Sequence, residues 1–279
     1  MTRRTFLRRT AILARSGTLA ASGCLGYAYF AERRWLRHER IEVGVRHLPA
    51  GMDGYRIVQL TDIHHERFMP DGTLAAMVEQ ANALNPDALA LTGDFVTASS
   101  GGIERLARFL AELRARDGVF GCFGNHDVWN GRRAIGAALA KAGVQMLVDD
   151  ARRIGGPGGS LLMAGLDSAW AGRPRLRQAL VDRRTREPVV LLMHEPDYFD
   201  FVAPTGQVAL QLSGHTHGGQ VALPFWGAIH LPRWGKKYER GHFERDGSQL
   251  YVSRGVGCTG LPFRFASRPE ITEIVLRST

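Results

Sequence analysis

The chain has 279 residues, of which 44% are hydrophobic and 23% are charged, an ordinary globular composition that suits one large domain or two small ones. Its formal net charge of +9 is unevenly placed, because residues 1–40 hold nine arginines against two glutamates, a net +7, and leave +2 on the other 239 residues. A nucleic-acid-binding surface needs its basic residues on the folded domain, so this charge distribution argues against nucleic acid as a partner.

The N-terminal segment has the pattern of a targeting sequence. Residues 2–9, TRRTFLRR, resemble the twin-arginine export signal, and a mildly apolar stretch follows over residues 11–31. A stretch of about 20 residues is long enough to span a bilayer. We therefore expect residues 1–40 to be a twin-arginine-type signal or membrane anchor with a linker, read by the export machinery, and the protein to be periplasmic or membrane-anchored at the cell envelope.

The fate of this segment stays open at the level of sequence. Arg33, Arg34, Arg37 and Arg40 follow the apolar stretch, which is an unusual flank for an exported side. Cys24 ends ASGC, which resembles a lipoprotein box that has alanine where a larger aliphatic residue is usual. Cleavage, lipidation at Cys24 and retention as an anchor are all compatible with the sequence.

Beyond residue 50 the chain repeats one pattern, in which a short apolar run of strand type ends in polar, metal-capable residues. Five segments follow it: Arg56–His65, Asp87–Phe95, Gly118–Asp127, Pro188–Asp197 and Gln207–His217. Helical spacing of apolar residues lies between them, over Gly72–Asn85, Ile103–Arg116 and Arg132–Ala142. This alternation predicts a single α/β domain over residues 41–279.

In open α/β sheets, sites form beyond the carboxyl ends of the strands, so the polar ends of the five segments are expected to meet. They supply Asp62, His64, Asp94, Asn125, His126, His194, His215 and His217. Six of the ten histidines lie in these strand ends, a concentration that ordinary turn residues with local hydrogen bonds do not explain. Carboxylates and imidazoles without a thiolate favour Mn, Fe, Zn or Co, and so many donors suit two ions. Cys122, in a run of small residues, is expected to be a packed thiol.

The order D-x-H, G-D, G-N-H-D, H and G-H-x-H resembles the calcineurin-like metallophosphoesterase superfamily. This resemblance implies a four-layer αββα sandwich, with two mixed β-sheets flanked by helices. It also implies that Asp62, His64 and His217 hold one ion, that Asn125, His194 and His215 hold the other, and that Asp94 bridges both. His126 would be the catalytic residue that protonates the leaving group, with Asp127 orienting it, and His65 would lie in a supporting position or at the surface.

The segments Gly214–Gly227 and Ser253–Ile271 narrow this resemblance to an exported or membrane-tethered branch of phosphodiesterases described as YkuE-like or YaeI-like. The implied function is hydrolysis of phosphodiesters or pyrophosphates at the cell envelope by a metal-activated hydroxide. One alternative is a UDP-diacylglucosamine pyrophosphatase of lipid A synthesis, and an alternative of another class is a non-catalytic metal-binding scaffold. Arg264 is expected either to contact phosphate or to be a surface or carboxylate-paired arginine.

The segment Pro224–Tyr238 mixes aromatic and basic residues directly after the last of the histidines. Its apolar members are Phe225, Trp226, Ile229, Leu231 and Trp234, and its basic members include Arg233, Lys236 and Lys237. Such a segment suits a membrane interface or an acyl-bearing phosphate substrate, whether lipid-linked or nucleotide-linked. The alternative is a packed loop with a solvated rim.

Overall fold

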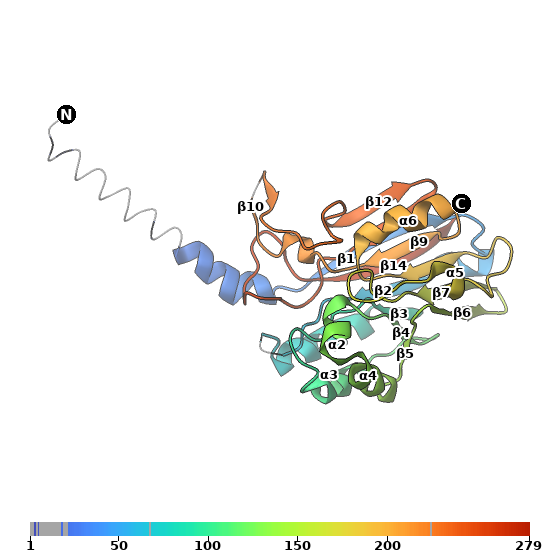
Figure 1. Cartoon of the computed structure of the whole chain (residues 1–279), viewed down its shortest axis with the longest axis horizontal. Helices are drawn as coiled ribbons and strands as arrows, with labels where there is room; N and C mark the ends of the chain where they lie inside the picture. The colour runs from blue at the N-terminus through green and yellow to red at the C-terminus, as the bar shows by residue number, and fades with distance from the viewer. Residues whose placement is uncertain (1–2, 4, 6–17, 19–21, 67, 224) are drawn as a thin grey trace.

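The computed structural model describes residues 3, 5, 18, 22–66, 68–223 and 225–279, and these form two facing six-stranded sheets (Figure 1). The first sheet has, in spatial order, β1 (Arg37–Val45), β14 (Glu270–Ser278), β2 (Arg56–Leu60), β3 (Ala88–Leu91), β4 (Val119–Gly121) and β5 (Val144–Met146). The second has β12 (Gly241–Arg245), β13 (Ser248–Val252), β9 (Leu210–Ser213), β8 (Val189–Leu192), β7 (Gly159–Gly165) and β6 (Asp150–Gly156).

Both sheets are mixed. Strands β2 to β5 pair in parallel, whereas β14 runs antiparallel to β2 and parallel to β1. In the second sheet β7, β8, β9 and β13 are parallel, and β6 and β12 pair antiparallel at the two edges. The parallel strands of one sheet end at one edge, which brings the polar segments that follow them together.

Alternation along the strands divides the interior into layers. In β2, Val58 and Leu60 pack toward helices, while Ile57 packs toward the second sheet. Such two-sided burial explains why the predicted strands are nearly continuous apolar runs. A third apolar cluster covers the outer face of the second sheet, where Leu191 meets Phe199. The expected four-layer αββα sandwich is therefore confirmed.

Three helices cover the first sheet: α2 (Asp71–Ala83), α3 (Ile103–Leu110) and α4 (Asn125–Lys141). The second sheet is covered by the short elements α5 (Leu176–Ala179), η4 (Pro196–Tyr198), α6 (Phe199–Val202) and η5 (Ala203–Thr205). Helix α3 ends earlier than its apolar spacing predicts, because Asn82 of α2 binds the Glu112 carbonyl and the Arg114 N–H and holds that turn out of the helix. Helix α4 begins earlier than predicted and is kinked at Gly131.

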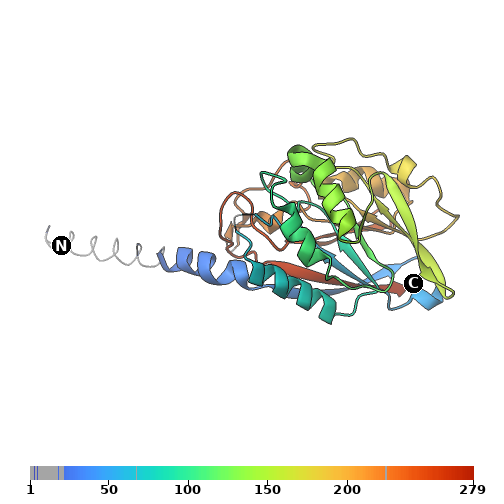
Figure 2. The same cartoon turned by 90° about the horizontal axis from the view of Figure 1, so that it is seen from below.

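The N-terminal part of the described chain is helical from residue 22 and includes η1 (Tyr27–Ala31) and η2 (Glu32–Arg34). It projects away from the sandwich (Figure 2). The boundary expected at residue 41 falls inside β1, which begins at Arg37. The twin-arginine motif lies outside the described residues except for positions 3 and 5. Within the described part of the chain, no helix is both long and apolar enough to cross a bilayer.

Candidate functional site

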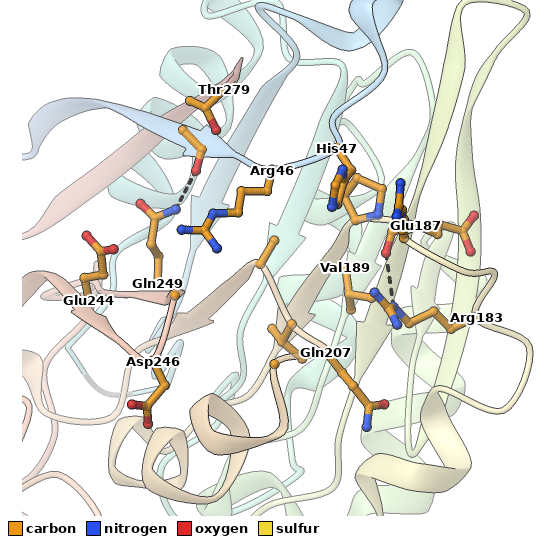
Figure 3. A pocket seen from close by; sticks show the side chains of 17 residues that line it. Arg46, His47, Arg183, Glu187, Val189, Gln207, Glu244, Asp246, Gln249 and Thr279 are labelled. Atoms are coloured by element: carbon orange, nitrogen blue, oxygen red, sulfur yellow. Dashed lines mark hydrogen bonds between the residues drawn. The ribbon is translucent and has the colours of Figure 1, made fainter.

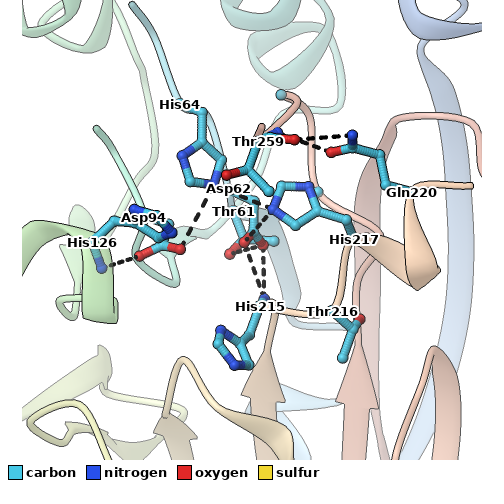
Figure 4. Close-up of polar contacts among 12 residues, drawn as sticks. Thr61, Asp62, His64, Asp94, His126, His215, Thr216, His217, Gln220 and Thr259 are labelled. Atoms are coloured by element: carbon cyan, nitrogen blue, oxygen red, sulfur yellow. Dashed lines mark hydrogen bonds and ion pairs between the residues drawn. The ribbon is translucent and has the colours of Figure 1, made fainter. Parts of the chain in front are cut away.

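The residues predicted from the strand ends meet at one edge of the sandwich (Figure 4). Asp62 follows β2, Asp94 follows β3 and Asn125 opens α4 after β4, all from the first sheet. His194 follows β8, and His215 and His217 follow β9, all from the second sheet. None of these side chains, nor that of His64, is more than 5% exposed. The structure thus buries seven polar groups in one place, which a protein tolerates only when the groups have partners.

These groups form two clusters of metal-capable atoms. In the first, His217 Nε2 lies 3.3 Å from an Asp62 oxygen and 3.2 Å from His64 Nε2. In the second, His194 Nε2 lies 3.2 Å from Asp94 Oδ2 and 3.2 Å from His215 Nδ1. The same Asp94 oxygen is 3.6 Å from His64 Nε2, so Asp94 stands between the clusters.

Backbone carbonyls determine which ring nitrogens of three histidines carry hydrogen. His64 Nδ1 is 3.0 Å from the Val96 oxygen, His194 Nδ1 is 2.7 Å from the Thr92 oxygen, and His215 Nε2 is 2.7 Å from the Arg233 oxygen. A carbonyl only accepts, so each of these nitrogens donates and the opposite nitrogen points inward as a lone pair. The carbonyls act as the outer partners that orient metal-binding imidazoles.

The inward groups fit bound cations. His194 Nε2 and His215 Nδ1 face each other at 3.2 Å, and two lone pairs would repel there, so the contact needs a positive charge, either a proton on His194 or a bound cation. Asn125 is buried, and neither its amide oxygen nor its amide nitrogen has a hydrogen-bond partner among the described residues. Orphaned buried polar atoms are rare in folded proteins, and a metal ligand role accounts for the Asn125 oxygen.

Burial and neighbouring charges put His64, His215 and Asp94 in the ionisation states that ligands need. Burial lowers the pKa of His64 to about 4 and that of His215 to about 3, so both rings are neutral near pH 7. Burial opposes ionisation of Asp94, but the attraction of His194 outweighs it and lowers the pKa of Asp94 below its ordinary range. Burial opposes protonation of His194, but the Asp94 carboxylate outweighs it and raises the pKa of His194 above its ordinary value, so a divalent ion would take the place of this proton.

The backbone is held in an uncommon conformation at these positions. Five of the seven candidate ligands have positive φ, between 44° and 73°: Asp62, His64, Asp94, His215 and His217. Residues with side chains adopt this region at a cost of order 1 kcal/mol or more each, and such residues concentrate at functional sites. A Cβ atom on Gly124 would overlap the Asp94 carboxylate, so the glycine before Asn125 is needed for the close approach of the two loops.

His126 lies beside the clusters and belongs to neither. Its backbone N–H donates to Asp94 Oδ1 at 3.0 Å, and its Nδ1 lies 2.6 Å from the Thr97 carbonyl oxygen, which leaves Nε2 for a partner in the adjoining cavity. The expectation that Asp127 orients this ring is wrong. At the third position of α4, the Asp127 carboxylate turns back to accept the N–H groups of Gly124, Asp94 and Phe95 at 2.8–2.9 Å.

Two further expectations are corrected by burial. Arg264 is fully buried and contacts neither solvent nor a carboxylate; it donates to the carbonyls of Arg254, Gly257, Ser267 and His217 at 2.9–3.4 Å. It therefore ties the loop after β13 to the segment that carries His217. His65 is also buried and so is not a surface residue, and its ring nitrogens have no hydrogen-bond partner within the described residues.

A cavity of about 770 Å³ opens over the clusters. Asp94, Asn125, His126, His215 and His217 form its floor, and Trp129, Trp170, Val221, Ile229, Leu261 and Phe263 form much of its wall. The two tryptophans touch edge to face at 4.9 Å and continue to His126 at 5.4 Å and His215 at 5.7 Å. Helical spacing from His126 was a usable signal for Trp129, whereas nothing in the sequence around Trp170 pointed to the site.

A second cavity, of about 520 Å³, lies at the opposite ends of β8 and β9 (Figure 3). Arg46, His47, Arg183, Gln207 and Glu244 are among its lining residues, and it contains none of the candidate metal ligands. Any metal-dependent chemistry at these clusters therefore belongs to the first cavity.

Comparison with known proteins agrees with this geometry. The sequence pattern of the family described as "Calcineurin-like phosphoesterase" matches residues 55–219. The chain is 34% identical to "Uncharacterized metallophosphoesterase YkuE" of Bacillus subtilis, with 100% of this chain and 99% of the relative covered. It is 31% identical to "Phosphodiesterase YaeI" of Escherichia coli, with 99% of both chains covered.

Solved structures share the architecture at low identity. Sulfate thiohydrolase SoxB of Thermus thermophilus superposes with a TM-score of 0.51 at 14% identity, over 81% of this chain and 57% of that one. The NAD nucleotidase of Haemophilus influenzae also gives 0.51 at 14% identity, over 72% of this chain and 45% of that one. At such identity the likeness concerns the fold alone.

Proposed function

The chain belongs to the calcineurin-like phosphoesterase family and is a metal-dependent phosphoester hydrolase, and from this premise we propose that it is a phosphodiesterase that acts at the cell envelope with two divalent ions. The observation that carries the proposal is the pair of three-residue clusters with Asp94 between them, on the floor of a large cavity. The relative from Escherichia coli that matches over 99% of both chains bears the name phosphodiesterase, which favours a diester over a monoester.

In this proposal Asp62, His64 and His217 hold one ion, Asn125, His194 and His215 hold the other, and Asp94 is shared. When bound, two such ions would neutralise charge on the phosphoryl oxygens and lower the pKa of water. Nitrogen and oxygen donors without a thiolate suit Mn, Fe, Zn or Co. The carbonyls of Val96, Thr92 and Arg233 keep three of the imidazoles pointed inward, so little reorganisation is needed for binding.

His126 is the proposed proton donor to the leaving oxygen. Its Nδ1–H donates to the Thr97 carbonyl, so the ring in its imidazolium form presents Nε2–H to the leaving oxygen of a bound substrate and becomes neutral when that proton is transferred. The 5.4 Å edge contact with Trp129 restricts rotation of the ring. A positioned acid of this kind contributes about 10²- to 10⁴-fold to rate, and most when the leaving group is a poor one.

The proposal also includes a substrate class and a place of action in the cell. The apolar cavity wall favours an ester with a bulky apolar or lipid-linked part, and UDP-diacylglucosamine, a nucleotide-linked lipid, is the second candidate substrate. Export by the twin-arginine route to the periplasm or the membrane rests on TRRTFLRR at residues 2–9. Replacement of Arg3 and Arg4 together by lysine should retain the protein in the cytoplasmic fraction; unchanged export would contradict this route.

The function is tested with purified protein that is stripped of metal and then supplied with Mn²⁺. Bis-aryl phosphodiester, mono-aryl phosphate and UDP-diacylglucosamine are compared, with Asp94→Ala as the variant. We expect metal-restored hydrolysis of the diester, reduced by at least about 10³-fold in the variant because both ions lose a shared ligand. Preference for UDP-diacylglucosamine would select the pyrophosphatase, and full activity of Asp94→Ala would refute the dinuclear site.

A non-catalytic scaffold was the alternative of another class. A scaffold has no need of a solvent-accessible cavity above a complete set of ligands or of an imidazole such as His126 beside them. Metal binding without turnover of all three substrates, across Mn²⁺, Zn²⁺ and Co²⁺, would nevertheless revive it.

A further inference from the structure

The hairpin of β10 (Ala222–Leu223) and β11 (Gly227–Ala228) exposes large apolar side chains. Phe225 is 106% exposed and Trp226 is 88% exposed, and they stand with Leu223, Ile229 and Leu261, which are 47–62% exposed. We call these five residues the apolar tip. Single exposed apolar residues are ordinary on protein surfaces, but a group on one hairpin and the loop bonded to it that includes a fully exposed Phe and Trp marks an interaction site.

The apolar tip is continuous with the catalytic cavity. Ile229 and Leu261 belong to both, since each lines the cavity and is more than half exposed. Gln220 donates its side-chain amide to the carbonyls of Thr259 and Leu261 at 3.0–3.1 Å, and so joins the hairpin to the loop of Leu261. A molecule whose apolar part lies along the tip therefore has a path of apolar side chains to the metal clusters.

The N-terminal helix emerges at the same end of the molecule as the hairpin, to the left of the sandwich in Figure 1. Its base is fixed there, because the Arg264 N–H donates to the Ala28 carbonyl at 3.3 Å and the Ser267 N–H donates to the buried Glu32 carboxylate at 2.8 Å. The helix exposes Phe30 within this base, at 66%, and Leu25 beyond it, at 58%.

Basic side chains surround this end. Arg34 is exposed at the base of the helix, Arg268 lies over the ring of Trp35 at 3.6 Å, and Arg233 is exposed just beyond the hairpin. One carboxylate, that of Glu239, lies near Gly227. Aromatic residues within a basic surround are the composition of proteins that settle in the interface of an anionic bilayer.

We propose that the apolar tip inserts into an anionic lipid surface and that the cavity takes an amphiphilic phosphoester directly from it. The apolar portion of the substrate passes between Ile229 and Leu261 while the phosphoester reaches the clusters. The proposal that the protein docks on a membrane depends only on the exposed residues. The proposed substrate class rests on the proposed function. Not all aromatic residues of the segment 224–238 belong to the apolar tip. Trp234 packs against Tyr198 and Phe201 and is not part of the tip.

Docking is tested with the full chain and vesicles that contain phosphatidylglycerol and brominated phosphatidylcholine, in which bromine quenches tryptophans within the bilayer. We expect quenching of wild-type fluorescence to fall clearly in Trp226→Phe and to be unchanged in Trp234→Phe. Trp35, Trp129 and Trp170 add the same background to all three proteins. Equal quenching of wild type and Trp226→Phe would overturn the proposal, because the N-terminal segment alone would then hold the protein on the membrane.

Substrate transfer is tested with two esters that share a leaving group: hexadecyl 4-nitrophenyl phosphate in the vesicles and ethyl 4-nitrophenyl phosphate in solution. The double variant Phe225→Ser, Trp226→Ser should hydrolyse the hexadecyl ester at least about tenfold more slowly and the ethyl ester at the wild-type rate. Phe201→Ser, which removes a 60% exposed ring from α6, is the matched control and should change neither rate.

The outcomes separate the two proposals. If neither ester is hydrolysed by the wild type, the proposed function fails and the quenching result alone decides docking. If the ethyl ester is hydrolysed but the double variant treats the hexadecyl ester as the wild type does, transfer from the membrane is refuted while the enzyme stands.

Discussion

Arg264 shows how much one buried side chain contributes to the site. Its guanidinium lies beside His217 Nδ1 at 3.3 Å and donates to the carbonyls of residues from three separate turns. Burial of a cation is costly unless every donor is paired, and here backbone oxygens do the pairing that a carboxylate usually does. Arginine is suited to this because its planar fork presents donors in several directions at once.

Replacement of Arg264 by methionine should lower the free energy of unfolding by about 3 kcal/mol or more, since it leaves several buried carbonyls without donors. It should also weaken metal binding, because the segment carrying His217 loses its anchor. Urea unfolding and metal titration measure the two effects. Arg277→Met, which removes an exposed pair with Glu42, should leave the free energy of unfolding nearly unchanged, because water screens both charges. Equal stability of the two variants would show that Arg264 is not an anchor.

At the scale of elements, helix α4 departs most from a regular geometry. Its first turn carries Asn125 and His126, and Asp127 pins that turn to the loop after β3 through backbone N–H groups. Six residues later Gly131 has φ 122°, outside the helical region, and the helix restarts in a new direction. The kink lets the first turn face the cavity while the rest packs on the sheet through Ile135 and Leu139.

Alanine at Gly131 should destabilise the protein by more than about 1 kcal/mol, because a residue with a side chain is strained at this φ. Alanine at Gly72 in α2 is the matched comparison. Its Cβ would meet open space, so it should stabilise by about 0.5–1 kcal/mol. Thermal or urea unfolding measures both variants, and a neutral or stabilising effect of Gly131→Ala would mean that the kink is not required.

At the scale of the whole molecule, the site joins the two sheets. Asp62, Asp94 and Asn125 come from the first sheet and His194, His215 and His217 from the second. Bound ions would therefore act as links between layers that otherwise meet through apolar contacts such as those of Phe120 and Leu192. Metal loading and global stability should be coupled, because an ion that binds only the folded state stabilises it.

Removal of metal with a chelator should lower the melting temperature, and Mn²⁺ should restore it. At about 100 times the dissociation constant, each ion adds about 2.7 kcal/mol to the free energy of unfolding. Differential scanning calorimetry measures the shift, and Asp94→Ala should show a much smaller one. A melting temperature that is the same in chelator and in Mn²⁺ would contradict a site shared by both sheets.

Sequence alone determined the local parts of this protein. The apolar runs, their polar ends and the helical spacing of α2 are properties of neighbouring residues, and they sufficed to predict an α/β domain and to nominate the seven residues that the structure gathers, together with His126. The four-layer sandwich was implied by the resemblance to the family. The order of small, acidic and imidazole residues also pointed to the family. The strands, helices and polar strand ends depend on periodicity and spacing within about ten residues, whereas the resemblance depends on the order of five motifs between Asp62 and His217.

Only the tertiary structure decided what depends on contacts between distant segments. Four features involve residues far apart in the chain. Strand β14 lies between β1 and β2, and Arg264 is paired with backbone carbonyls. Asp127 anchors backbone N–H groups, and Trp170 forms part of the cavity wall. A side chain's burial and partners are set by packing free energy summed over the whole core. A short sequence window does not contain that sum.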